Sequence, residues 1–133
     1  MPTSIQYLED IKGETPFIQW FIESLTSEEQ DFVDLVFEGV LSTHGIELLG
    51  GNWLKDLGDE LYQLRLRILG NDGKARILLR VFLTFISHDE ILIISGYCKL
   101  RNQGSVNQRF EISRAKLLLK QWKSDSDTMW YST

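Results

Sequence analysis

Residues 61–101 read LYQLRLRILGNDGKARILLRVFLTFISHDEILIISGYCKLR. Apolar and polar residues alternate from Leu64 onward, which is typical of a β-strand with one buried face. Asn71-Asp72-Gly73 is a strong hairpin signal, and the alternation resumes over residues 75–86. After a second polar turn, residues 90–99 form a third apolar segment. The stretch therefore predicts a three-strand antiparallel meander.

The segments before the meander predict one strand and two helices. Residues 4–11 are consistent with a strand, and Pro16 is favoured at the first position of a helix over residues 16–25. Thr26 and Glu29 have the spacing of a capping box and open a second helix. That helix is expected to end near Gly45, since glycine is the common residue beyond a helix C-terminus.

A last helix is expected over residues 108–123, followed by a polar tail over residues 124–133. Residues 46–60 contain Gly50, Gly51 and Gly58 and are expected to be irregular. The order strand, two helices, meander and helix predicts an α+β fold in a single domain over residues 1–123, with helices covering one face of the sheet.

The charge is distributed unevenly along the chain. Residues 1–60 carry 2 Lys/Arg against 13 Asp/Glu, whereas residues 61–101 carry 7 against 3, and the whole chain has a net charge of −5. A sheet that gathers cations in an otherwise acidic chain indicates an anionic ligand, and a phosphate backbone is the most common one. The acidic N-terminal half also leaves open a basic protein as the partner.

Several site classes are excluded by composition. The single cysteine, Cys98, excludes an internal disulfide and a Cys-rich zinc site, and His44 and His88 lack metal-ligand spacing. We expect no metal and no cofactor. No apolar run is long enough to span a bilayer, and the first residues lack the features of a secretory signal, so a cytoplasmic protein is expected.

Arginines of the predicted hairpin form the main candidate site. Arg65 and Arg67 on one strand share face parity with Arg76 and Arg80 on its partner, and cross-strand neighbours lie about 5 Å apart. Guanidinium groups bind phosphate through two parallel hydrogen bonds and stay charged at neutral pH. The alternative stays open that these arginines cover the solvent side of the sheet and pair with carboxylates.

Residues at the end of the third strand extend the candidate site. Tyr97 and Lys99 share one side of that strand, so an aromatic ring that could stack on a base lies beside a cation. Arg101 follows as a further cation. Surface positions without a binding role remain the alternative for these residues.

Four short motifs also resemble, in order and separation, those of a known toxin family. They are Ile11-Lys12-Gly13-Glu14-Thr15-Pro16 followed by Trp20-Phe21, Leu61-Tyr62-Gln63-Leu64-Arg65, Ala75-Arg76-Ile77-Leu78, and Gly96-Tyr97-Cys98-Lys99 followed by Glu111-Ile112-Ser113-Arg114-Ala115. They resemble the RelE/ParE superfamily of type II toxin–antitoxin toxins, in its HigB-like, phage-derived branch, over nearly the whole chain.

The resemblance implies a RelE-like (microbial-RNase-like) fold and a metal-independent mRNA endoribonuclease acting on ribosome-bound messages. It implies a helix-turn-helix antitoxin as partner, and mRNA and the ribosome as targets. By resemblance Arg65, Arg76 and Lys99 are the catalytic residues. Arg67, Arg80, Tyr97 and Arg101 would support substrate binding.

Two other interpretations stay open. The chain could be a non-catalytic protein of the same fold, a target inhibitor or phage-derived interaction module that docks through its acidic helices. It could also be a housekeeping domain with a charged sheet face, because fold does not fix function. Monomer and homodimer both remain open.

Overall fold

A computed structural model of the chain describes residues 3–101 and 105–131, and in the last helix the side chains of residues 107–125. Its elements, in chain order, are β1 (Ser4–Tyr7), α1 (Pro16–Ser24), α2 (Ser27–Val36), a π-helical turn (Phe37–Leu41), α3 (Ser42–His44), a 3-10 turn (Gly45–Leu48), β2 (Leu54–Gly58), β3 (Leu61–Leu69), β4 (Ala75–Ser87), β5 (Glu90–Cys98) and α4 (Ser105–Tyr131). The mixed α+β class is confirmed.

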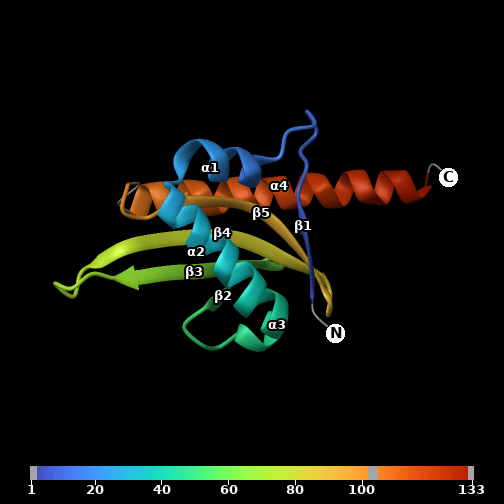
Figure 1. Cartoon of the computed structure of the whole chain (residues 1–133). Helices are drawn as coiled ribbons and strands as arrows, with labels where there is room; N and C mark the ends of the chain where they lie inside the picture. The colour runs from blue at the N-terminus through green and yellow to red at the C-terminus, as the bar shows by residue number, and fades with distance from the viewer. Residues whose placement is uncertain (1–2, 102–104, 132–133) are drawn as a thin grey trace.

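The strands form one sheet in the order β1-β5-β4-β3-β2 (Figure 1). The predicted meander is β3, β4 and β5, and its antiparallel pairing is confirmed. β1 pairs in parallel with β5 at one edge. β2 pairs antiparallel with β3 at the other edge, so the expectation that residues 46–60 are irregular throughout is wrong.

The turn between β3 and β4 contains the predicted Asn-Asp-Gly signal. Gly73 has φ +80°, a left-handed conformation that glycine adopts without strain, and its N–H donates to the carbonyl of Gly70. Beyond the turn Leu69 pairs with Ala75, but Ile68 pairs with Ile77. One residue of β4 is therefore extra, a β-bulge that shifts the side-chain alternation at Arg76.

Local signals place the first two helices as predicted. Pro16 is the first residue of α1. At α2 the Thr26 hydroxyl accepts the N–H of Glu29, while the Glu29 carboxylate accepts the N–H of Thr26, so the capping box is confirmed. α3 ends at His44, and Gly45, which has φ +51°, is the residue that caps it and begins the 3-10 turn.

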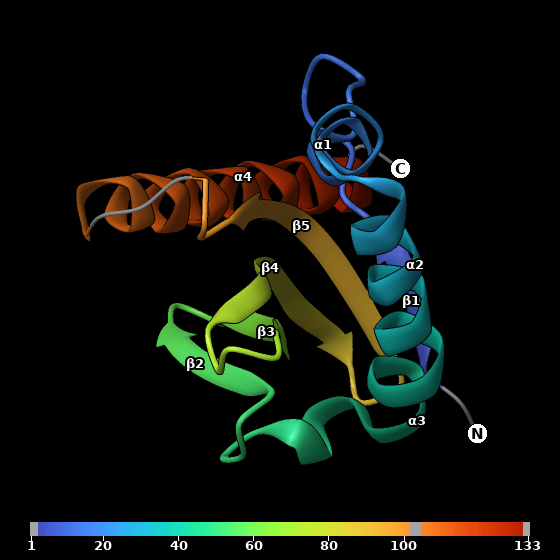
Figure 2. The same ribbon diagram turned by 60° about the vertical axis from the view of Figure 1, so that its left-hand side comes forward.

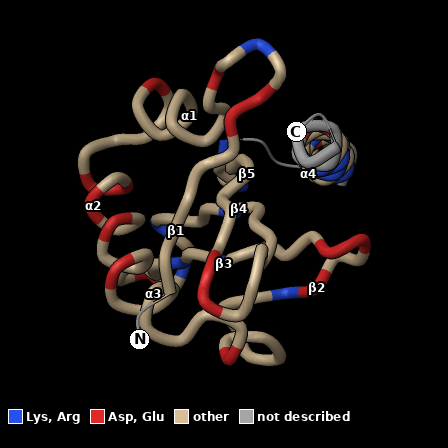
Figure 3. The backbone as a smooth tube through the Cα atoms, turned by 90° about the vertical axis from the view of Figure 1, so that its right-hand side faces the viewer, with Lys and Arg blue, Asp and Glu red and all other residues tan. Residues whose placement is uncertain are grey.

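Helices cover both faces of the sheet, not one face as predicted. α1 and α2 pack on one face, where Phe17 and Val33 join a core with Leu79 of β4. α4 packs on the opposite face, where Ala115 and Leu119 join a second core with strand residues. Figures 2 and 3 show the curved sheet between α2 on one side and α4 on the other.

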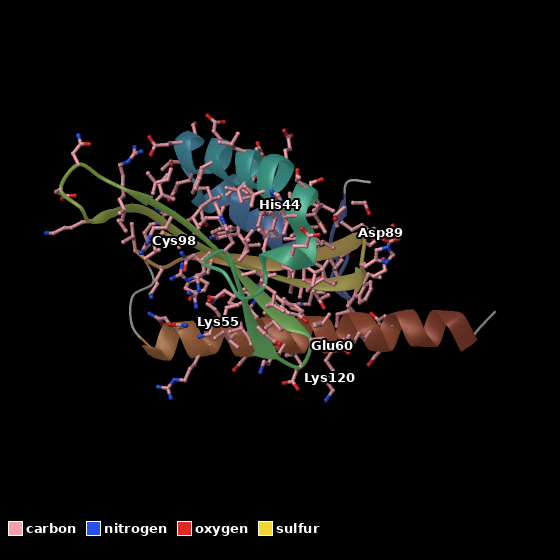
Figure 4. All side chains as sticks on the ribbon, turned by 90° about the horizontal axis from the view of Figure 1, so that it is seen from below. His44, Lys55, Glu60, Asp89, Cys98 and Lys120 are labelled. Carbon is pink, nitrogen blue, oxygen red and sulfur yellow. The ribbon has the colours of Figure 1, made fainter. Side chains whose placement is uncertain are left out.

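Ion pairs connect α4 to the β2–β3 turn. Lys116 Nζ lies 3.2 Å from a carboxylate oxygen of Asp59, and Lys123 pairs with Glu60 at the same turn, beside α4 in Figure 4. α4 starts three residues before and ends eight residues after the predicted helix 108–123. Most of the predicted tail is therefore part of α4, and residues 132–133 lie outside the described residues. None of the described helices combines the length and apolar character needed to cross a bilayer.

Candidate functional site: a cationic groove

The pairing of three strands brings cationic side chains together on the α4 face of the sheet. Arg65 of β3 lies directly opposite Arg80 of β4. In the next row Arg67 lies opposite Leu78, and the N–H of Lys99 donates to the carbonyl of Leu78 at 2.9 Å. Arginines and a lysine from β3, β4 and the end of β5 thus occupy adjacent positions.

These side chains line a groove of about 530 Å³. Its lining residues are Asn52, Trp53, Arg65, Arg67, Leu69, Ala75, Leu78, Arg80 and Lys99. Four of them are cationic, and no carboxylate belongs to the lining within the described part of the chain. An anion is the ligand that such a groove favours.

Trp53 is a groove residue that sequence reasoning missed. It stands just before β2, and its carbonyl accepts the N–H of Arg65 at 2.7 Å, which fixes this segment against β3. The glycines around it predict an irregular segment, so the sequence alone does not place Trp53 beside the arginines. A half-buried tryptophan beside arginines supplies a ring on which a nucleobase could stack.

Positively charged side chains repel one another at the centre of the groove. Burial lowers the pKa of Arg80, the neighbouring Tyr97 hydroxyl opposes this, and the positive charges of Arg65 and Arg67 lower the pKa further. In addition, the Nε of Arg65 is buried and has no hydrogen-bond partner among the described residues. A bound anion would relieve the repulsion among the arginines and accept a hydrogen bond from the Arg65 Nε–H.

Arg76 does not belong to the groove. The β-bulge at this position ends the parity with Arg80, so the prediction that the two share a face is wrong. The Arg76 guanidinium donates instead to both carboxylate oxygens of Glu28 on α2, at 2.7 and 2.8 Å. Both side chains are more than half exposed, which fits the alternative interpretation of a surface ion pair.

Arg101 is also engaged elsewhere. Its guanidinium donates to the two carboxylate oxygens of Glu29 at 3.0 and 3.2 Å and to the carbonyl of Ser24 at 3.1 Å. Burial disfavours the charged form of Glu29, but the hydrogen bonds from Arg101 and Thr26 outweigh it and lower the pKa of this carboxyl. Arg101 therefore connects the end of β5 to α2, and it does not line the groove.

The side chain of Tyr97 lies on the α4 face of the sheet and is covered by α4. Its side chain is 1% exposed, and its ring stacks on Phe82 with centroids 5.8 Å apart. Burial raises the pKa of the Tyr97 hydroxyl, Arg80 opposes the rise and Glu111 adds to it. The predicted base-stacking role does not fit this buried position, because α4 covers the ring's side of the sheet.

Metal-ligating residues do not cluster in the described part of the chain. No group of three or more His, Cys, Asp or Glu side chains there has a geometry that could hold a metal ion. Cys98 is a free, buried thiol, and the two histidines are exposed.

The groove lined by Arg65, Arg67, Arg80 and Lys99 is the candidate functional site.

The chain matches no protein-family model, and no curated protein is significantly similar to it in sequence.

Proposed function

We propose that the chain is a metal-independent endoribonuclease of RelE-like fold, the toxin of a type II toxin–antitoxin system, which grips the phosphodiester backbone of mRNA in the cationic groove. The observation that carries the proposal is the convergence of Arg65, Arg67, Arg80 and Lys99 on one groove without a lining carboxylate in the described chain. The sequence motifs that resemble those of the toxin family supply the reaction class, and a cytoplasmic location stays an expectation from the sequence.

In the proposed reaction the 2′-hydroxyl of a ribose attacks the adjacent phosphorus. The proton of the 2′-hydroxyl passes to solvent water, the bond from phosphorus to the 5′-oxygen of the next nucleotide breaks, and the departing 5′-oxygen takes a proton from water. The products are a 2′,3′-cyclic phosphate and a free 5′-hydroxyl. Negative charge builds up on the phosphoryl oxygens as the pentavalent transition state forms. Guanidinium and ammonium donors that are already in place stabilise this charge without reorganisation.

The residues take separate roles in this scheme. Arg65 and Arg80, which lie opposite each other, would hold the phosphoryl oxygens between them. Lys99 would add a point charge, and Arg67 would contact a flanking phosphate. Trp53 takes the base-stacking role that Tyr97 is too buried to fill. In this scheme Arg76, which is ion-paired to Glu28 outside the groove, has no catalytic role.

Cleavage of a labelled single-stranded RNA in the presence of EDTA tests the proposal. We expect a product with a 2′,3′-cyclic phosphate, and no cleavage of a substrate carrying 2′-deoxyribose at the cut position. Arg65→Ala and Arg80→Ala should each lower kcat by about 10²–10³, the usual cost of removing one transition-state donor.

Arg76→Ala is the matched control, since it removes the same side chain from the same strand but outside the groove. It should cleave at the wild-type rate. Intact RNA with the wild-type protein, on free message and on message in a translation reaction, would exclude the nuclease. Equal losses in Arg76→Ala and Arg80→Ala would exclude the groove as its site.

A second candidate is a protein that holds an RNA or another phosphate-bearing target without cleaving it. Neither carboxylate nor imidazole belongs to the described groove lining, which favours this candidate. It predicts that RNA binds and that Arg80→Ala weakens binding, while the RNA stays intact. Copurification with a helix-turn-helix protein would support the toxin–antitoxin context of either candidate.

A further inference from the structure

The outer edge of β1 is an unpaired strand edge on the side of the molecule opposite β2. β1 is the last strand of the described sheet, with β5 on one side and no described strand on the other. Figure 3 looks onto this edge and shows β1 in front of the rest of the sheet. An unpaired edge can accept a strand from another chain.

Hydrogen bonds identify which backbone groups face outward. The N–H groups of Ser4 and Leu8 donate to carbonyls on the β5 side, each at 2.8 Å. Because backbone groups alternate along a strand, those of Ile5 and Tyr7 point to the outer edge. They present two N–H donors and two carbonyl acceptors in the spacing of a sheet ladder.

Thr3 supports this assignment, because its outward groups already bind the neighbouring helix. Its N–H donates to the carbonyl of Ser42 at 2.8 Å, and the Ser42 hydroxyl donates to the carbonyl of Thr3 at 3.1 Å. Ser42 thus occupies, at Thr3, the position of a residue in a partner strand. The open part of the edge begins one step further along, at Ile5.

A groove of about 290 Å³ runs beside this open edge on the α2 face. It is lined by Thr3, Ile5, Tyr7, Asp34, Phe37, Glu38 and Ser42. Its lining combines the apolar side chains of Ile5 and Phe37 with the carboxylates of Asp34 and Glu38, which belong to exposed residues. Burial raises the pKa of the Tyr7 hydroxyl, and the negative charge of Asp34 raises it further.

The charge around this groove selects the partner. Residues 13–54 contain eight Asp/Glu and no Lys or Arg. A second copy of this chain, paired edge to edge, would bring the same carboxylates toward one another. A strand that carries lysine or arginine would instead place them against Asp34 and Glu38.

We propose that β1 is a docking edge for a basic, extended segment of another protein, which adds to the sheet as a sixth strand. Its backbone pairs with Ile5 and Tyr7, and its alternate side chains place cations at Asp34 and Glu38. Main-chain pairing supplies affinity in such strand addition, while the side chains that alternate along the strand supply specificity. The edge lies away from the cationic groove, so both sites can be occupied together.

A short capped peptide of alternating valine and lysine serves as the probe, with a fluorescent label for anisotropy. Two matched peptides accompany it, one with glutamate in place of lysine and one with N-methyl groups on alternate residues. N-methylation keeps the charge but removes the N–H groups that a ladder needs. We expect each change to weaken binding by about tenfold or more.

Two double variants distinguish the effect of the groove carboxylates on peptide binding from the effect of the other acidic residues of α1 and α2. Asp34→Asn with Glu38→Gln should weaken binding of the lysine peptide about fivefold, the effect of two partly exposed ion pairs. Glu23→Gln with Asp31→Asn removes the same charge from exposed positions outside the groove, and it should change binding by less than about twofold. The bound lysine peptide should slow amide exchange at Ile5 and Tyr7.

Three results would overturn the proposal. One is equal binding of the N-methylated and unmodified peptides, which would show that the peptide binds through its charge without backbone pairing to β1. The second is equal loss in the two double variants. The third is self-association of the protein through β1, because a second copy would then occupy the edge. Failure of RNA cleavage would leave this proposal intact, since neither the edge nor its groove contains a residue of the cationic groove.

Discussion

Gly96 of β5 lies directly against the side chain of Trp20 in α1. A Cβ atom added at Gly96 would lie 2.5 Å from Cζ3 of Trp20 and within 2.9 Å of two further ring carbons. Carbon atoms pack best at about 3.5–4.0 Å. The Gly96→Ala variant therefore requires the indole or α1 to move by about 1 Å.

Movement of the indole is restricted by its neighbours. Trp20 packs on Phe17 with ring centroids 5.6 Å apart, and Phe17 is a fully buried core residue. Overpacking at such a site costs about 1–3 kcal/mol. We expect Gly96→Ala to lower the free energy of unfolding in urea by that amount.

Gly39 provides the matched control for the same chemical change. It lies in the π-helical turn, and a Cβ added there would meet nothing within 4 Å. Gly39→Ala should therefore stabilise the protein by about 0.5–1 kcal/mol, because alanine loses less backbone entropy than glycine on folding. The two variants are expected to have opposite signs.

A double-mutant cycle tests the stated cause. In a Trp20→Ala background the ring that opposes the new methyl group is gone, so Gly96→Ala should cost less than about 0.5 kcal/mol. An equal cost in both backgrounds would refute the close-approach argument, and the destabilisation would then arise from β5 itself.

Two further predictions follow from the packing and the ion pairs. Phe82 is fully buried in the core beneath α4, so Phe82→Ala should lower the free energy of unfolding by about 3–5 kcal/mol; a cost below about 1 kcal/mol would contradict the packing of α4 on the sheet. The lowered pKa of Glu29 means that its ion pair with Arg101 stabilises the folded state above the ordinary carboxyl pKa of 4.5 and loses this contribution as the pH falls through the lower, folded value. The stability difference between wild type and Arg101→Ala, measured in urea across this acidic range, should shrink as the pH falls, and a constant difference would contradict this assignment.

Local patterns predicted the parts of the fold that depend on local physics. The capping box at Thr26 and the glycine turn before β4 each use neighbouring residues, so a single sequence contains the whole signal. β2 carried no comparable signal. It is a short edge strand next to glycines, and a bulge near Asp56 interrupts its alternation.

The sequence of β5 itself indicates that both faces of the sheet are covered. Residues 91–98 are all buried, and the unbroken apolar run from Ile91 to Ile94 is typical of a strand covered on both sides. Given that run, a helix on each face is the expected arrangement. The burial of Tyr97 beneath α4 follows from it.

The candidate site was predicted only in part, because side-chain parity fails at a bulge. Arg65, Arg67, Arg80 and Lys99 meet as the alternation predicted, whereas the extra residue in β4 turns Arg76 toward Glu28. Ion pairs with α2 also depend on contacts between distant segments. No local sequence pattern predicts these ion pairs.

Salt dependence of RNA binding tests the central claim, that these four cations form one phosphate-binding groove. The affinity for a short 2′-O-methyl RNA, which the proposed reaction cannot cleave, is measured over a range of salt concentrations. Each phosphate contact with single-stranded nucleic acid contributes about −0.7 to the slope of log K against log salt. Arg80→Ala should make the slope shallower by about this amount, and Arg76→Ala should leave it unchanged. A slope that Arg76→Ala alters as much as Arg80→Ala, or no salt-dependent binding by the wild type, would contradict the account.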